Sequence, residues 1–364
     1  MVELASIPKG STVVLVGTRK GLYVFHSKDR RRWKLAGRFF EGIPVHNARY
    51  DPREGVAWAA VNSFTWGPLV HRSKTLTKWT RGKAGPAYSK KSGWSVAKIW
   101  NVVGGGPAAP GVLYAGVEPA GLFRSEDDGD SWELVEGLTS HATRPKWEPG
   151  NGGLCLHTIL PDPKSATRMV VGISAVAVFS TENGGDTWKT MNDGMTARWF
   201  PDHKPRDIGY CPHKLARDPE DPNTIYQQHH WGVFRWDDAK GRWLDVSRGL
   251  SSSFGFGLTV GSEGGSAYVV PLKSDGDRTT LGEMAVYRTR NRGRAWQRLR
   301  TGLPRPAHLT ILREGVGSDG QDPVGVYVAT EQGQVFSTRD GGDHWDVIAD
   351  NLAPAMSVTA SPYP

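Results

Sequence analysis

The sequence predicts an all-β protein, a seven-bladed β-propeller whose blades are four-stranded antiparallel sheets. Three observations lead to this prediction. A turn motif that ends in tryptophan recurs through the chain, apolar strand-like runs flank its copies, and the two chain ends complement each other as parts of one blade. A repeat with a regular period of this kind is typical of propellers, which place short sheets around a central channel.

The turn motif, here named the box, reads Ser/Thr-x-Asp/Asn-x-Gly-x-x-Trp. Four segments match it in full: Ser125–Trp132, Thr181–Trp188, Thr289–Trp296 and Thr338–Trp345. Three weaker copies lie at Ser27–Trp33, Ser73–Trp79 and Trp236–Trp243. The seven tryptophans that end the copies are 46 to 56 residues apart: Trp33, Trp79, Trp132, Trp188, Trp243, Trp296 and Trp345. This register predicts a single repeating domain over residues 1–364.

The residue types of the box explain a tight turn. A Ser or Thr hydroxyl and an Asp or Asn side chain can each bond backbone N–H groups one to three residues further on, which closes a turn from inside. Glycine supplies a positive φ that a side chain disfavours, and tryptophan buries a large ring between neighbouring sheets. The acidic box residues are therefore predicted to be structural, and neither catalytic carboxylates nor calcium ligands.

Strand signals recur around the boxes. Two apolar runs precede a box and a polar outer strand follows it, as in residues 112–117, 121–124 and 133–136. Residues 12–16 and 21–25 supply two strands of a blade that has no first strand, and residues 356–360 form a lone strand. The last strand is therefore predicted to join the first blade and close the ring. Seven innermost strands are expected near residues 45, 97, 155, 213, 256, 308 and 356.

Composition limits the classes of partner. The formal charge is +8 and the pI is near 9.4, but the basic residues are scattered, so no nucleic-acid partner is predicted. The sequence shows neither a cationic start followed by an apolar run nor an 18-residue apolar stretch. We therefore expect no signal peptide, no membrane partner and a cytoplasmic location. The two cysteines, Cys155 and Cys211, do not make a disulfide framework.

Antiparallel alternation places the boxes at one end of the ring. The starts of the innermost strands and the turns between second and third strands then line the opposite mouth of the channel, where loops on a rigid scaffold commonly bind ligands. The candidate catalytic residues at this mouth are His46, Glu118, His157, His213 and His308. The candidate substrate-binding residues are Arg19, Asn62, Trp66, Arg144, Trp147, His230, Arg313 and Glu314.

Three interpretations of these residues stay open. The first is a transition-metal cofactor in a His/Cys ring, because N and S ligands suit such ions. Its candidate ligands are His46, Cys155, His157, Cys211, His213 and His308. The second is a catalytic pocket in which a histidine acts as general acid or base with Glu118 or Glu314 as its carboxylate partner. In the third, the histidines line the channel and bond only backbone and water.

The boxes resemble the Asp boxes, or BNR repeats, of sialidases, sortilin-type receptors and photosystem II assembly factors. Over essentially its whole length the chain is most similar to the bacterial BNR-repeat glycosyl hydrolases or exo-sialidase-like proteins, through segments such as Val16–Leu22, Gly152–His157 and Val269–Leu272. Sialidases bind the substrate carboxylate with three arginines. Their early Arg-Ile-Pro motif is absent here, and no motif assigns Arg19, Arg144 and Arg313 to such a triad. The resemblance thus implies a sialidase-like propeller that is not a true sialidase.

The resemblance implies two classes of function. Sialidase-like propellers include hydrolases and lyases, so an enzyme acting on a glycoside or another acidic small molecule at the channel mouth is expected. The assembly factors instead imply a binding or assembly propeller without catalysis. A metal-dependent enzyme that uses the His/Cys ring is the third alternative, and fold alone does not choose among them.

Overall fold

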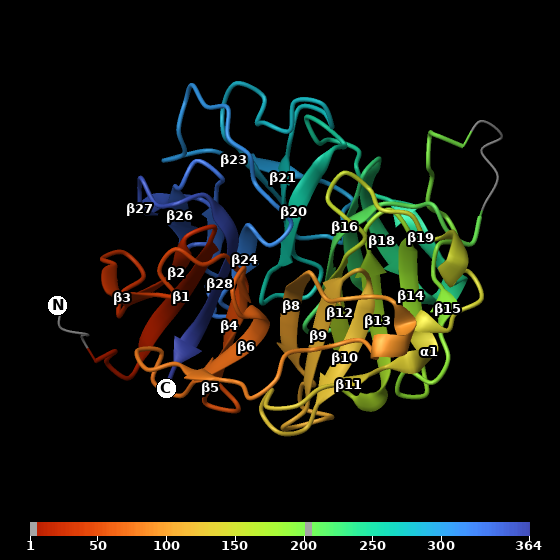
Figure 1. Ribbon diagram of the computed structural model, residues 1–364. Helices are drawn as coiled ribbons and strands as arrows, with labels where there is room; N and C mark the ends of the chain where they lie inside the picture. The colour runs from red at the N-terminus through yellow and green to blue at the C-terminus, as the bar shows by residue number, and fades with distance from the viewer. Residues whose placement is uncertain (1–5, 201–205) are drawn as a thin grey trace.

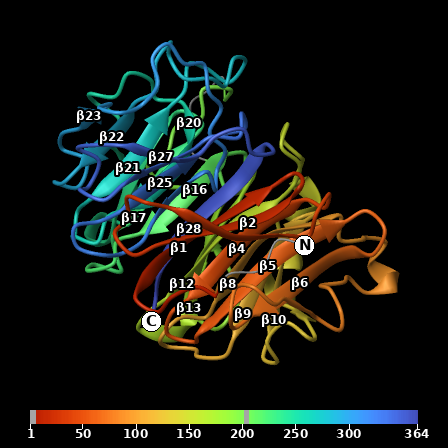
Figure 2. The same ribbon diagram turned by 90° about the vertical axis from the view of Figure 1, so that its left-hand side faces the viewer.

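The chain forms seven four-stranded antiparallel sheets arranged in a ring (Figure 1, Figure 2). The computed structural model describes residues 6–200 and 206–364. Within this part the only α-helix is α1 (Glu136–Thr139), and short 3-10 helices occur at Lys90–Ser92, Arg144–Lys146 and Asp238–Lys240. The predicted all-β propeller with seven blades is confirmed.

The blades follow one another along the chain, except that the first contains the last strand. The first blade comprises β28 (Ala355–Tyr363), β1 (Ser11–Thr18), β2 (Gly21–Ser27) and β3 (Lys34–Phe39). The second comprises β4 (Val45–Asp51), β5 (Val56–Ser63), β6 (Gly67–Ser73) and β7 (Thr80–Arg81). The third comprises β8 (Lys98–Gly104), β9 (Leu113–Glu118), β10 (Gly121–Ser125) and β11 (Glu133–Leu134). The fourth comprises β12 (Leu156–Asp162), β13 (Ser165–Ile173), β14 (Ala177–Thr181) and β15 (Lys189–Thr190).

The other three blades repeat the same order of strands from the channel outward. The fifth comprises β16 (Pro212–Arg217), β17 (Ile225–His229), β18 (Gly232–Asp237) and β19 (Arg242–Asp245). The sixth comprises β20 (Gly255–Val260), β21 (Ala267–Pro271), β22 (Val286–Thr289) and β23 (Gln297–Leu299). The seventh comprises β24 (Val316–Ser318), β25 (Val326–Ala329), β26 (Val335–Thr338) and β27 (Asp346–Ala349).

The core lies between neighbouring blades. In β1, Val13 and Leu15 pack in a cluster with Val45 of the second blade, whereas Val14 and Val16 pack in a cluster with residues of the seventh. Successive side chains of a strand point to opposite faces, so a strand covered on both faces is a continuous apolar run. All eight residues of β1 are accordingly buried.

The predicted closure of the ring by the last strand is confirmed. β28 pairs antiparallel with β1 from Ser11 opposite Tyr363 to Thr18 opposite Ala355. The two strands lie side by side in Figure 2 although they come from opposite ends of the sequence. This pairing completes the first blade and gives β1 a neighbour on each side.

One innermost strand differs from the prediction. Six begin where expected, but the innermost strand of the seventh blade, β24, begins at Val316 and not near His308. The segment around Leu309 pairs instead with the long connection between β21 and β22. Thr280 N–H donates to Leu309 O at 3.0 Å, and Leu309 N–H donates to Thr280 Oγ1 at 3.1 Å. These bonds occupy backbone groups that an earlier strand start would have used.

The four full box turns share one geometry. Thr338 Oγ1 donates to Asp340 Oδ1 at 2.7 Å and accepts the N–H of Gly342 at 2.9 Å. Asp340 Oδ1 also accepts the N–H of His344 at 3.0 Å, so two of these bonds span four residues, beyond the expected one to three, whereas Asp340 N–H donates to Thr338 Oγ1, two residues earlier, at 3.4 Å. Gly342 has a φ of 106°, and the buried Trp345 donates Nε1–H to Gly342 O at 3.0 Å. The same hydroxyl bonds recur at Ser125, Thr181 and Thr289.

We expect Thr338→Val to lower the free energy of unfolding by about 1–3 kcal/mol, because it leaves the buried Gly342 N–H without its acceptor. Urea unfolding measures the change. Thr196→Val, at an exposed threonine, is the matched control and should stay within about 0.5 kcal/mol of the parent protein. Equal stability of the two variants would show that the hydroxyl does not hold the turn.

Candidate functional site

A cavity of 830 Å³ lies at the end of the ring opposite the box turns. The turns β1–β2, β5–β6, β9–β10 and β25–β26 form it together with the starts of β4, β8 and β28, as strand alternation predicts. Its basic lining residues are Arg19, Lys20, Lys98, Arg278 and Arg313, and its acidic ones are Glu118, Glu314 and Glu331. Its aromatic rings are Phe64, Trp100 and Phe256. The excess of basic groups favours an anionic ligand.

Glu118 is fixed by two donors on the neighbouring strand. Lys98 and Glu118 are direct cross-strand partners, and Trp100 lies two residues further along β8. Glu118 Oε2 accepts the indole N–H of Trp100 at 2.8 Å and a bond from Lys98 Nζ at 3.3 Å. Gly153 covers the other oxygen, since a Cβ there would lie 2.4 Å from Glu118 Oε1, and its φ is 91°. The carboxylate is thus held rigidly in the cavity wall.

Arg313 lies between two aromatic rings. Its guanidinium carbon is 5.8 Å from the centre of the Trp100 ring and 5.3 Å from that of Phe256. Nη2 donates to Ser174 Oγ at 3.2 Å, and Nε is buried with no partner. Among residues 6–200 and 206–364 no carboxylate forms an ion pair with it, unlike Arg19, which pairs with Glu331 at 2.8 Å. A partly buried cation in this state is suited to bind an anionic group.

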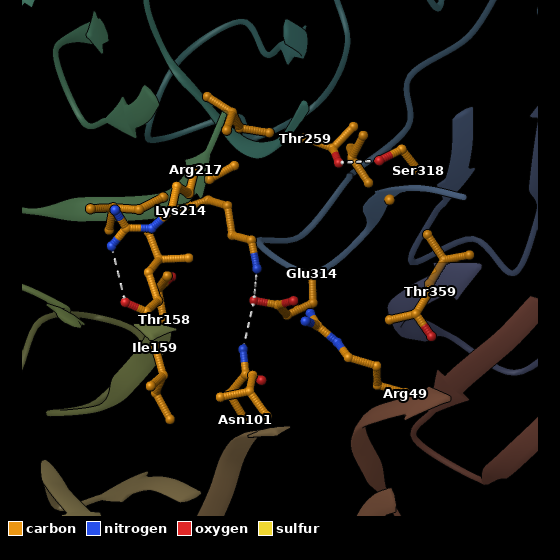
Figure 3. A pocket seen from close by; sticks show the side chains of 18 of the residues that line it. Arg49, Asn101, Thr158, Ile159, Lys214, Arg217, Thr259, Glu314, Ser318 and Thr359 are labelled. Atoms are coloured by element: carbon orange, nitrogen blue, oxygen red, sulfur yellow. Dashed lines mark hydrogen bonds and ion pairs between the residues drawn. The ribbon is translucent and has the colours of Figure 1, made fainter. Parts of the chain in front are cut away.

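Glu314 joins the cavity to the channel beneath it. The carboxylate lines both the mouth cavity and a second cavity of 320 Å³ on the channel axis. Glu314 Oε1 pairs with Lys214 Nζ and accepts a bond from Asn101 Nδ2 at 3.2 Å (Figure 3). Burial lowers the pKa of Lys214, and the charge of Glu314 opposes this shift. Arg49 also lines this lower cavity.

The predicted histidines occupy different environments. His46 lines the cavity, and its Nδ1 is 2.8 Å from Nδ2 of the buried Asn62. Burial, assisted by Lys98 and Arg19, lowers the pKa of His46 to about 3, so the ring is neutral. His157 also lines the cavity, but both its nitrogens are engaged, Nδ1 with Thr158 Oγ1 at 2.9 Å and Nε2 with Pro212 O at 3.0 Å.

His213 and His308 lie away from the cavity lining. His213 is buried behind Phe256, with ring centres 4.5 Å apart, and its Nδ1 donates to Gly255 O at 2.6 Å. His308 is exposed on the segment that precedes β24. The described structure therefore brings Glu118, Glu314, His46 and His157 together and leaves these two histidines apart.

Some of the predicted binding residues line or support the cavity, and others lie outside it. Arg19, Arg313 and Glu314 line the cavity, and Asn62 supports it from behind. Trp66 is exposed on the β5–β6 turn, and Phe64 of the same turn lines the cavity. Arg144 lies outside the lining, with its guanidinium 4.2 Å from the Trp94 ring and 4.8 Å from the Trp147 ring. His230 is half-buried beside the fifth blade's aromatic residues.

Seven charged or aromatic lining residues lie outside the predicted sets of catalytic and binding residues: Lys20, Phe64, Lys98, Trp100, Phe256, Arg278 and Glu331. Lys98 and Phe256 begin innermost strands, so the rule that identified His46 could have found them. Arg278 comes from the connection between β21 and β22. This connection joins the second and third strands of its blade, so it belongs to the turns that were expected to line the mouth.

The predicted metal ligands are separated by the structure. Cys211 and His213 lie in a group with His230 in which the ligand atoms are all within 4.8 Å of one another. His46, Cys155, His157 and His308 are outside this group. Burial raises the pKa of the Cys155 thiol to about 12.

Among the described residues, no helix is long and apolar enough to cross a membrane.

Fold and site together define a seven-bladed β-propeller with a charged, aromatic-lined cavity at one mouth of its channel. No protein family model matches the chain. A curated relative, the oligoxyloglucan-reducing end-specific xyloglucanase of Emericella nidulans, is 23% identical over a match of 158 residues that covers 39% of this chain and 18% of that protein.

Solved structures show the same fold at low identity. The GH74 xyloglucanase of Xanthomonas campestris superposes with a TM-score of 0.61 and 16% identity, over 98% of this chain and 53% of that one. The structure of YCF48 bound to D1 peptide gives a TM-score of 0.54 and 12% identity, over 96% of this chain and 88% of that one. The chain thus has GH74 xyloglucanases among its structural neighbours and spans about half the length of the Xanthomonas campestris enzyme. The resemblance to Asp-box sialidase-like proteins stays a prediction.

Proposed function

We propose that the protein cleaves an anionic glycoside, as a hydrolase or lyase, in the mouth cavity. The observation that carries this proposal is Arg313, a partly buried cation without an acidic partner among the described residues. A carboxylate or phosphate of the ligand would satisfy its free N–H donors, and charge-assisted bonds of this kind are strong. The xyloglucanases among the structural neighbours agree with a carbohydrate ligand.

The cavity offers surfaces that suit a sugar ring. Trp100 and Phe256 flank Arg313, and the exposed Phe64 stands at the rim. Mostly apolar walls with a few fixed polar groups are typical of small-molecule sites. A sugar whose anionic group meets Arg313 would therefore lie near these rings and beside Glu118.

Glu118 and Glu314 supply the two carboxylates that glycoside cleavage commonly uses as acid, base or nucleophile. Both line the cavity, and each is oriented by a cation and a neutral N–H donor. His157 is unsuited to exchange protons because both its nitrogens are engaged. In a lyase, Arg313 would instead stabilise the negative charge that develops on a uronate carboxylate while Glu118 removes the neighbouring C5 proton. The C4–O bond then breaks, a C4–C5 double bond forms, and the leaving oxygen takes up a proton from solvent.

We expect Glu118→Gln and Glu314→Gln each to lower kcat by about 10²–10⁴-fold on aryl uronides or uronate oligosaccharides. Arg313→Gln should lower kcat/KM for these anionic substrates by about 10–100-fold and affect neutral glycosides far less. Release of reducing ends without an unsaturated product identifies hydrolysis, and the absorbance of an unsaturated product identifies a lyase. Glu126→Gln, at an exposed box residue on the opposite face, is the control and should keep full activity.

A binding function is the second candidate. It is favoured by YCF48, a propeller of which this chain covers 88% and whose structure holds a peptide. Absence of turnover over the whole panel, combined with binding of anionic oligosaccharide or acidic peptide that Arg313→Gln abolishes, would replace the enzyme by a binding protein. Unchanged binding and turnover in Arg313→Gln would reject both the enzymatic and the binding proposal.

A further inference from the structure

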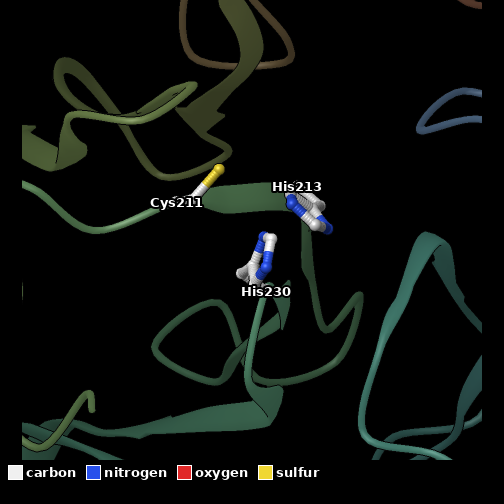
Figure 4. Close-up of side chains that lie close together, drawn as sticks. All are labelled: Cys211, His213 and His230. Atoms are coloured by element: carbon white, nitrogen blue, oxygen red, sulfur yellow. The ribbon is translucent and has the colours of Figure 1, made fainter. Parts of the chain in front are cut away.

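Three metal-type donors meet at the mouth-facing end of the fifth blade. Cys211 precedes β16, His213 is its second residue and His230 follows β17. Their Sγ and ring nitrogen atoms lie within 4.8 Å of one another, and Figure 4 shows the three side chains close together. The cluster lies outside the mouth cavity, behind the Phe256 ring on which His213 stacks.

The pairing of β16 with β17 explains why these residues meet. Pro212 is opposite His229, and His230 N–H donates to Cys211 O at 3.1 Å, so Cys211 and His230 face each other across the two strands. The register shifts between Pro212 and Lys214, which turns His213 relative to a regular strand. Two residues of one strand and one of its neighbour therefore form a compact set on a rigid sheet, the placement that a metal site requires.

The surroundings of the histidines prepare them as ligands. His213 Nδ1 donates to Gly255 O at 2.6 Å, so its Nε2 carries the lone pair. A backbone carbonyl in this position is the usual support of a metal-binding histidine. Around His230, the rings of Trp231 and Phe254 have their centres 4.6 and 5.2 Å from the imidazole and limit its motion.

A carboxylate lies beside the cluster. Asp275 Oδ2 is 3.8 Å from His230 Nε2, and Arg278 holds the other carboxylate oxygen at 2.6 Å. A thiolate and a carboxylate together balance the charge of a divalent cation. Zinc with S, N and O ligands is tetrahedral, with bonds of about 2.0–2.3 Å, so Cys211, His213 and His230 need to draw closer than the 4.8 Å within which their donor atoms lie. Asp275 lies outside that group and has to move further toward it.

We propose that Cys211, His213 and His230, with Asp275 as fourth ligand, bind one divalent transition-metal ion of the zinc type. The ion ties the fifth blade to the connection between β21 and β22, which carries Asp275 and contributes Arg278 to the mouth cavity. On binding, the Cys211 thiol loses its proton to solvent and Sγ forms the bond to the metal. Nothing in this site depends on the glycoside-cleaving function.

Titration of chelator-treated, dialysed protein with Co²⁺ tests the site. The parent protein should bind one equivalent and show thiolate-to-cobalt charge-transfer absorption, and Zn²⁺ should displace the Co²⁺ and raise Tm by mass action. Cys211→Ser should abolish the charge-transfer band. His230→Gln and Asp275→Asn should each weaken Co²⁺ binding by at least about 10-fold.

Two variants serve as matched controls. Cys155→Ser removes the other cysteine, and His308→Gln removes an exposed histidine; both should retain the band and the affinity. Circular dichroism and Tm without metal show whether each variant is folded, and the half-buried His230 is the safest to replace. A band that survives Cys211→Ser, or a parent protein that takes up no Co²⁺ at stoichiometric concentration, would overturn the assignment.

Discussion

Deleting residues 355–364 is expected to abolish the folded monomer, or to lower Tm by more than about 10 °C if a folded species remains. The deletion removes β28, which pairs with β1 along its whole length and buries Ala355 and Val358 against the seventh blade. The exposed edge of β1 is an eight-residue strand with the apolar run Val13–Val16 at its centre, and such an edge recruits other chains. Size-exclusion chromatography should therefore show aggregates, and calorimetry should show no cooperative transition near that of the full chain.

A peptide of residues 355–364 provides the control. Added during refolding of the truncated chain, it should restore a monomeric, cooperative species, since the missing strand contributes backbone pairing as well as side chains. A truncated chain that stays monomeric with unchanged melting would mean that the ring is held without its last strand.

Acidification from pH 7.5 to 5 is expected to reduce the free energy of unfolding by about 4 kcal/mol through two histidines alone. Burial, together with nearby cations, lowers the pKa of His46 to about 3 and of His71 to about 4. In the unfolded chain these rings titrate near 6.5. Between the two pKa values the unfolded state binds more protons, so stability is full above pH 6.5 and declines as the pH falls through that value. Each ring contributes about 2 kcal/mol at pH 5, against a typical total of about 5–15 kcal/mol.

Urea unfolding of metal-free protein between pH 7.5 and 5 measures this slope. His71→Gln should make the loss between the two pH values smaller by about 2 kcal/mol, because a buried group that charges on unfolding has been removed. His308→Gln, at an exposed histidine, should leave the loss unchanged. A stability that does not vary over this range would show that the buried rings are charged, or that they remain neutral in both states.

Much of the fold could be predicted because its signals are local. The box residues recur in near-regular register, and their hydroxyl, carboxylate or amide, glycine and tryptophan groups act within one turn. The unmatched strands at residues 12–16 and 356–360 revealed the closure for the same reason: a blade needs four strands. The predicted start of β24 was wrong because the segment around Leu309 is fixed by hydrogen bonds to Thr280. No local sequence pattern encodes this contact between different blades.

The sequence could predict which loops surround the site, but not how their side chains are arranged. The rule that strand starts and second-to-third turns share one mouth located His46, Glu118 and Arg19 at the cavity. It could not determine that the nitrogens of His157 are already engaged, or that His230 comes to face Cys211 across the hairpin. Those outcomes depend on side-chain directions and on a register shift within one blade.

By itself the sequence determined the seven blades, the box turns and the face on which function should be sought, because each is set by contacts within a few residues and by the count of strands. Tertiary structure alone decided which groups on that face act together. It placed Arg313 between Trp100 and Phe256 with no acidic partner among the described residues, and it gathered Cys211, His213 and His230 at one corner of a blade. The physical reason is that charge and ligand chemistry depend on distances of a few ångströms between residues far apart in the chain, which repeat patterns leave open.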